Sequence, residues 1–100
     1  MLVKDIMNVI KNCKNNYVKW SVVDKRKDRI ELTNDYDKCV KFVIKIEKNE
    51  LGEHITVRDE HMQKLVALFY KDDFFDDYES TDEGIKQAIQ SCVHHFNYYY

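Results

Sequence analysis

A chain of 100 residues has the size of one domain, and 44% hydrophobic and 13% aromatic residues can form a core, which excludes an intrinsically disordered protein. Two glycines and no proline exclude flexible or proline-rich linkers, and no apolar run is long enough to cross a bilayer. The net charge of −2 conceals an asymmetry: residues 1–48 hold 12 Lys and Arg against 7 Asp and Glu, and residues 49–100 hold 4 against 11. We therefore expect one cytoplasmic domain, residues 1–100, without a signal peptide or membrane span.

The first predicted element is a helix, because Val3, Ile6, Ile10 and Cys13 follow helical spacing up to the polar residues 14–16. The period then changes to two, and each polar cluster between the alternating runs predicts a turn. Strands are expected at residues 17–23, 29–33 and 39–47, with turns at 24–28 and 34–37. A fourth, short strand is expected at residues 54–58, after a turn at 49–53 that contains Gly52.

Helical spacing returns after the strands. Met62, Leu65, Val66 and Phe69 would line one face of a second helix that begins near Asp59. A third helix would begin at residues 80–83, which have the form of a capping box, and its apolar stripe comprises Ile85, Ala88, Ile89, Cys92, Val93 and Phe96. The order α-β-β-β-(β)-α-α predicts an α+β fold: a two-layer sandwich with a three- to four-stranded antiparallel meander and three helices on one face.

The sequence offers little chemistry for catalysis. Two isolated glycines cannot form a phosphate-binding loop, and neither a Cys-x-x-Cys pair nor a His-x-x-x-His spacing occurs. The odd set Cys13, Cys39 and Cys92 indicates reduced thiols, mostly buried. A catalytic pair of Cys92 or Cys39 with His54 or His61 would need an exposed, activated thiolate. We therefore expect no catalytic residue, no cofactor and no metal, and not an enzyme.

Basic residues at the first turn raise the question of nucleic-acid binding. Lys25, Arg26, Lys27 and Arg29 are flanked by acids at positions 24 and 28, and the domain is not basic overall. A solvated hairpin tip is therefore the preferred interpretation, and no direct nucleic-acid partner is expected.

The strongest functional signal is an acidic stretch at residues 72–83, which has no Lys or Arg. Its acids are Asp72, Asp73, Asp76, Asp77, Glu79, Asp82 and Glu83, interleaved with Phe74, Phe75 and Tyr78. One interpretation is a solvated loop that ends at a helix N-terminus, where acids are favourable. The other is a negative patch that occupies a basic groove, with the three aromatic residues as hydrophobic anchors.

Three segments resemble the small acidic anti-CRISPR proteins of phages, which inhibit the RNA-guided nuclease of type II systems. They are Asp5-Ile6 to Ile10-Lys11-Asn12 with Tyr17-Val18-Lys19-Trp20-Ser21, then Lys64 to Phe69, and finally Tyr78-Glu79. The order α-β-β-β-α-α is also shared. The resemblance implies mimicry of the DNA duplex by acids before the third strand and at the last helix. Those positions are Asp37 with Lys38, and Ser80 with Thr81, and only Asp37 is acidic.

The sequence thus predicts a non-enzymatic inhibitor or interaction protein, encoded by a phage or mobile element. Its partner would be the basic, nucleic-acid-binding surface of a nuclease, contacted through the stretch 72–83 and Asp37. The alternative hypothesis is an immunity or antitoxin-like protein that neutralises a nuclease toxin, and a small enzyme is the third and less favoured hypothesis. The oligomeric state is left open, because the exposed aromatic residues fit a dimer contact as well as a partner contact.

Overall fold

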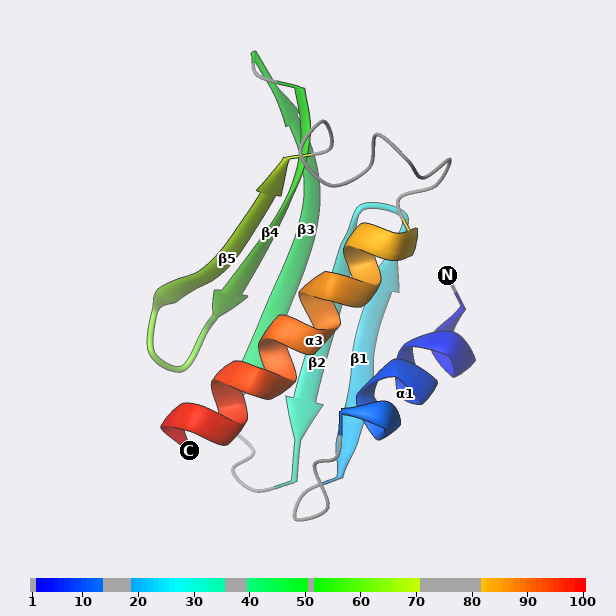
Figure 1. Cartoon of the computed structure of the whole chain (residues 1–100), viewed down its shortest axis with the longest axis vertical. Helices are drawn as coiled ribbons and strands as arrows, with labels where there is room; N and C mark the ends of the chain where they lie inside the picture. Colours follow the sequence, from blue (N-terminus) through cyan, green and yellow to red (C-terminus); the bar gives the residue numbers. More distant parts are fainter. Residues whose placement is uncertain (1, 14–18, 36–39, 51, 71–81) are drawn as a thin grey trace.

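A computed structural model describes residues 2–13, 19–35, 40–50, 52–70 and 82–100. Figure 1 shows the elements in chain order: helix α1 (Val3–Asn12), strands β1 (Trp20–Arg26), β2 (Arg29–Asn34), β3 (Lys41–Asn49), β4 (Gly52–Asp59) and β5 (Lys64–Tyr70), and helix α3 (Asp82–Tyr99). The α+β class and the antiparallel meander predicted from the sequence are confirmed.

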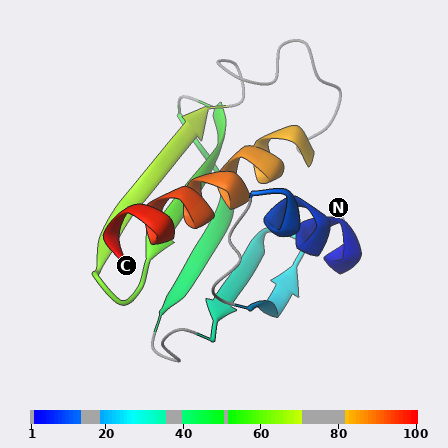
Figure 2. The ribbon, with the colours of Figure 1, turned by 60° about the horizontal axis from the view of Figure 1, so that its bottom comes forward.

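The five strands form one antiparallel sheet in the order β1-β2-β3-β4-β5. Each strand pairs with the next one along the chain, as short turns between alternating segments dictate. Both helices cover the same face, with α3 lying diagonally over the middle of the sheet and α1 beside it near β1 (Figures 1 and 2). The opposite face, called the open face below, has no helix from the described part of the chain over it.

The alternation of the strands positions the core between the two layers. Ile30 pairs with Ile44 and Leu32 with Phe42, and these four side chains are buried beneath the helices. From α3, the stripe of Ile85, Ala88, Ile89, Cys92, Val93 and Phe96 is buried against them, as predicted. Trp20 links the layers, because its ring lies 5.8 Å from that of Phe42 and meets the ring of Phe96 edge-on at 5.3 Å.

Helix α1 forms where helical spacing predicts it, and Ile6 and Ile10 are its buried residues. The carboxylate of Asp5 accepts a hydrogen bond from the backbone N–H of Leu2 at 3.2 Å, which satisfies one donor at the helix start. The first predicted turn is shorter than expected. Asp24 to Arg26 continue β1 after a β-bulge, and only two residues, 27 and 28, connect β1 to β2.

The helix predicted from Asp59 to Phe69 is wrong. Residues 60–63 form a turn, and β5 follows as a fifth strand that pairs with β4. The structure therefore describes two helices where three were predicted, and five strands where three or four were predicted. A run of six apolar residues from Leu65 to Tyr70 satisfies helical spacing by chance, and this run instead pairs with β4 along one side as an edge strand. The fourth strand is confirmed and is longer than expected.

Candidate functional site

The acidic stretch predicted as the site falls largely outside the described residues. This holds for Asp37 and for every position from 72 to 79, including Phe74, Phe75 and Tyr78, and for the predicted cap at residues 80 and 81. Asp82 is the first residue of α3, and Glu83 lies in the first turn with its side chain partly exposed. Carboxylates there are stabilised by the partial positive charge of the helix N-terminus. Both ends of the stretch are thus held by regular structure, since β5 ends at Tyr70 and α3 begins at Asp82.

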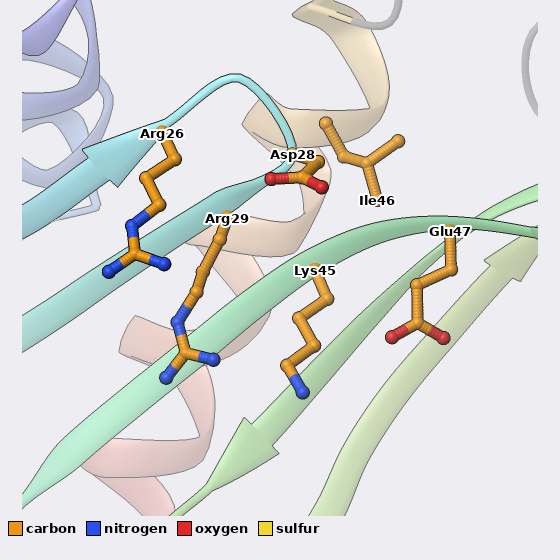
Figure 3. A pocket seen from close by; sticks show the side chains of 6 residues that line it. All are labelled: Arg26, Asp28, Arg29, Lys45, Ile46 and Glu47. Carbon is orange, nitrogen blue, oxygen red and sulfur yellow. The ribbon is translucent and has the colours of Figure 1, made fainter.

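The basic turn predicted as a solvated hairpin tip borders a shallow hollow on the open face. The hollow has a volume of about 260 Å³, and Figure 3 shows that it collects side chains from β1, β2 and β3. Its lining residues are Arg26, Asp28, Arg29, Lys45, Ile46 and Glu47. Because three cations and two acids line it, the hollow is not a surface of one charge, and it gives no preference for a nucleic-acid backbone.

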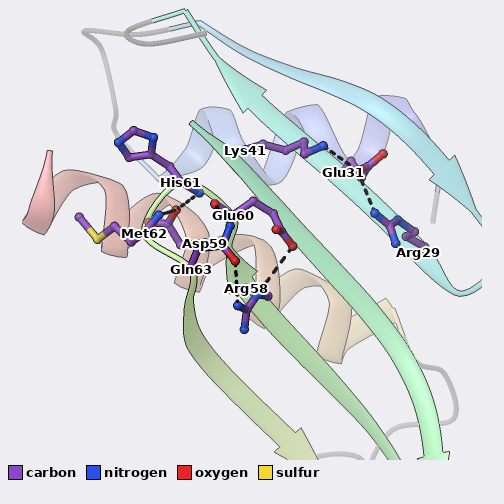
Figure 4. A network of polar contacts seen from close by, with 9 residues as sticks. All are labelled: Arg29, Glu31, Lys41, Arg58, Asp59, Glu60, His61, Met62 and Gln63. Carbon is purple, nitrogen blue, oxygen red and sulfur yellow. Dashed lines mark hydrogen bonds and ion pairs between the residues drawn. The ribbon is translucent and has the colours of Figure 1, made fainter. Parts of the chain in front are cut away.

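Four cations of the open face form ion pairs, within a strand, between two strands or with the following turn. Glu31 lies between two cations, 3.0 Å from the guanidinium of Arg29 and 3.2 Å from the ammonium of Lys41 (Figure 4). The hydrogen bond from Arg29 lowers the pKa of Glu31; partial burial opposes this effect, and Lys41 reinforces it. The guanidinium groups of Arg26 and Arg58 pair with Asp24 and Glu60 respectively, at 3.3 and 3.8 Å.

The most deeply buried charged group is Asp59, at the end of β4. Its Oδ1 accepts hydrogen bonds from the backbone N–H groups of His61 and Met62, at 2.9 and 3.0 Å (Figure 4). Its Oδ2 accepts from His95 Nε2 at 3.0 Å and from the hydroxyl of Tyr100 at 2.9 Å. Burial by itself raises the pKa of Asp59, but these four donors outweigh it and leave the pKa below the usual range. Asp59 is therefore an ionised anchor between the β4–β5 turn and the end of α3.

Sequence reasoning missed this network. Asp59 was interpreted as an acid at a helix N-terminus, and the bonds to residues 61 and 62 show that it instead holds a tight turn. Its other partners, His95 and Tyr100, lie 36 and 41 residues further along the chain. The polar run from Asp59 to Gln63 could have predicted the turn. The contacts of Asp59 with His95 and Tyr100 could not be predicted from local sequence, because these residues are 36 and 41 positions away.

The described thiols lie in protected positions. Cys92 is fully buried in the core, and burial followed by the nearby negative charge of Asp59 raises its pKa strongly. Burial also raises the pKa of Cys13, which is partly exposed and donates to the carbonyl of Val9. Cys39 lies outside the described residues. The candidate pair of Cys92 with His54 or His61 therefore lacks an activated thiolate, because a buried thiol beside a carboxylate stays protonated.

A groove runs between β5 and the C-terminal half of α3. Its volume is about 560 Å³, and it is lined by Lys64, Leu65, Val66, Ser91, His94, His95, Tyr98 and Tyr99. The ammonium of Lys64 lies 5.1 Å from the centre of the Tyr99 ring, in a cation–π contact. We call this feature the β5–α3 groove.

Within the described residues, no group of three or more His, Cys, Asp or Glu side chains is placed to hold a metal ion. In the same part of the chain, no helix combines the length and the apolar character that a membrane crossing requires. No protein family, curated protein or solved structure matches this chain.

Proposed function

We propose that this chain is a non-enzymatic binding protein that presents residues 72–83 to the basic, nucleic-acid-binding surface of a nuclease and so inhibits it. The observation that carries the proposal is the charge of this stretch, which has seven carboxylates and no Lys or Arg. Like charges at this density repel one another over the Debye length of about 8 Å at physiological salt. A partner that supplies cations relieves this repulsion and gains affinity and a fast association rate.

The ion pairs of the open face support this proposal. Arg26, Arg29, Lys41 and Arg58 take their acidic partners from the same strand, an adjacent strand or the turn that follows. These four cations therefore have acidic partners among Asp24, Glu31 and Glu60. The proposal accordingly assigns the acids of the stretch 72–83 to cations of a partner molecule.

The resemblance to small anti-CRISPR proteins indicates which partner to test first, the RNA-guided nuclease of a type II system. Such a nuclease holds duplex DNA in a positively charged channel. Carboxylates spaced along a short segment compete there with phosphates, and Phe74, Phe75 and Tyr78 supply apolar anchors of the kind that dominate interface energies.

The direct test is inhibition of DNA cleavage by a purified type II nuclease loaded with guide RNA. Exposed charge pairs contribute about 0.5–1 kcal/mol each, so loss of four of them weakens binding by about 30- to 1000-fold. The variant replaces four acids of the stretch by their neutral amides: Asp73→Asn, Asp76→Asn, Asp77→Asn and Asp82→Asn. We expect the wild-type chain to suppress cleavage and the variant to leave it intact.

A control of equal charge change separates the stretch from net charge. It replaces four acids elsewhere: Asp28→Asn, Asp35→Asn, Glu47→Gln and Glu50→Gln, all of them exposed. We expect this control to inhibit as the wild type does, and circular dichroism of both variants to match the wild type. Full inhibition by the variant of the stretch 72–83, or equal loss in both variants, contradicts the proposal.

A further inference from the structure

Exposed apolar side chains concentrate at one corner of the molecule. Among the described residues, eight large hydrophobic side chains are exposed, and five of them lie on the β4–β5 turn, on β5 or at the end of α3. These five are Met62, Leu65, Leu68, Tyr98 and Tyr99. Scattered exposed apolar residues are ordinary, but exposed apolar residues that gather around one edge strand indicate an interaction surface.

The patch wraps around the outer edge of the sheet. Leu65 and Leu68 pair with Arg58 and Thr56 of β4, whose side chains belong to the open face. Tyr98 and Tyr99 lie on the helix side, where they line the β5–α3 groove, and Tyr98 is 81% exposed. In the described part of the chain, β5 pairs only with β4 and is therefore an edge strand of the described sheet.

The two edges of the sheet differ in how they discourage pairing. Both edge strands have a β-bulge, but β1 adds the charged run Asp24-Lys25-Arg26. Strand β5 is uncharged from Leu65 to Tyr70, and its only charge, Lys64, stands at its first position. Charged side chains on an edge block the addition of another strand, and an uncharged apolar edge permits it. The β5 edge is therefore the one prepared for a partner strand.

We propose that this edge binds a second copy of the chain, with the two β5 strands antiparallel across a two-fold axis. Two copies of an uncharged strand meet without repulsion, and an antiparallel arrangement keeps the two Lys64 ammonium groups at opposite ends of the new ladder. Pairing of the two edges brings exposed apolar side chains of both copies into contact, and their burial adds to the backbone hydrogen bonds of the new ladder. The sheets of the two copies become one continuous sheet.

Analytical ultracentrifugation of the full chain, from about 1 to 500 µM, tests for self-association at micromolar dissociation constants. The wild-type chain, whose monomer mass is 12.1 kDa, sediments at twice that mass at the upper concentrations. The double variant Leu65→Lys/Leu68→Lys adds charge to the edge and removes two apolar contacts. Its dimer dissociation constant rises by about 30- to 1000-fold, and it sediments as a monomer.

The matched control places the same charges on exposed apolar residues away from β5: Leu2→Lys/Val23→Lys, at positions 69% and 59% exposed. This variant stays dimeric. Tyr98→Ser provides a second variant that leaves the strand unchanged, because its side chain is almost fully exposed, and it raises the dissociation constant about tenfold. A wild-type chain that stays monomeric at all concentrations overturns the inference, and so does a control that dissociates as fully as the β5 variant.

The dimer does not depend on the proposed function. Its readout is the mass of the chain alone, without a nuclease, whereas the proposed function is read from cleavage. A chain that dimerises without inhibiting, or inhibits as a monomer, separates the two proposals.

Discussion

Replacement of Asp59 by alanine should cost more stability than any other single change at the β4–β5 corner. The carboxylate is fully buried and accepts four hydrogen bonds, two from its own turn and two from the end of α3. The Asp59→Ala variant removes all four acceptor contacts. It also removes the acceptor of the buried His95 side chain.

The magnitude follows from these contacts. Loss of one partner of a buried charge-assisted network costs about 3–5 kcal/mol, since a buried polar group such as His95 loses its acceptor. Domains of this size have about 5–15 kcal/mol of total stability, so the variant is marginal. Tyr100→Phe removes only one of the four bonds and should cost about 1.5 kcal/mol.

The effect should depend on pH in a defined direction. The native pKa of Asp59 is lowered, so the unfolded chain binds the proton more readily, and the ionised carboxylate stabilises the fold above the unfolded pKa of about 3.9. This contribution is lost as the pH falls through the native pKa. The stability difference between wild type and Asp59→Ala is therefore fully present at pH 5 and shrinks as the pH falls below about 3.9 towards pH 3.

Urea unfolding followed by the fluorescence of Trp20, the only tryptophan, measures this difference. With a urea dependence of about 1–2 kcal/mol per M, the midpoint of Asp59→Ala should fall by about 1.5–5 M at pH 5. A loss below about 1 kcal/mol, or a difference that is the same at pH 3 and pH 5, would refute the assignment of Asp59 as an ionised anchor.

Two further predictions concern the backbone and the thiols. Gly52→Ala should destabilise the chain by about 1 kcal/mol or more in the same urea assay. The cause is the backbone, because Gly52 has a φ of +114° that residues with a side chain rarely adopt; it is not a clash, because an added Cβ would meet no atom within 4 Å. An unchanged midpoint would show that this backbone conformation is not required. In native protein, a thiol reagent followed by mass spectrometry should label Cys13 well before Cys92, which should react only on unfolding; equal rates would contradict its burial.

The spacing of apolar residues predicted those helices and strands in which this spacing fits only one type of secondary structure. The α1 spacing of Ile6 and Ile10, the alternation around Phe42 and Ile44, and the stripe of α3 all reappear as buried faces. Such patterns are sufficient because burial on one face of an element fixes its period. They do not fix the ends: β1 was expected at residues 17–23 and runs from Trp20 to Arg26, where pairing with β2 extends it through polar residues.

The segment from Asp59 to Phe69 shows what local patterning cannot decide. Met62, Leu65, Val66 and Phe69 fit helical spacing, yet an apolar run of six residues is also the length of a strand, and β-branched and aromatic residues favour the strand. Pairing with β4 decides between them, and β4 itself was only expected as a short strand. The error also hid the apolar patch, since Leu65 would face the core on a helix and is 51% exposed on β5.

The site predicted from the sequence stays a proposal. It comprises the acidic stretch 72–83 and Asp37, and it was predicted from the density of negative charge. What the structure adds is its context: β5 ends just before the stretch, α3 begins within it, and four cations of the open face have acidic partners of their own. Three of these ion pairs join residues two apart in the sequence, but the pair of Lys41 with Glu31 joins two strands and depends on their register.

The salt dependence of binding to a guide-loaded type II nuclease tests the proposed inhibition most directly. Biolayer interferometry from about 50 to 500 mM NaCl spans Debye lengths from about 14 to 4 Å. The account predicts tight binding at low salt, a dissociation constant that rises about 100-fold or more across the series, and a much flatter dependence for the variant with four amides in the stretch 72–83. Absence of binding at low salt, or an affinity that salt leaves unchanged, would contradict it.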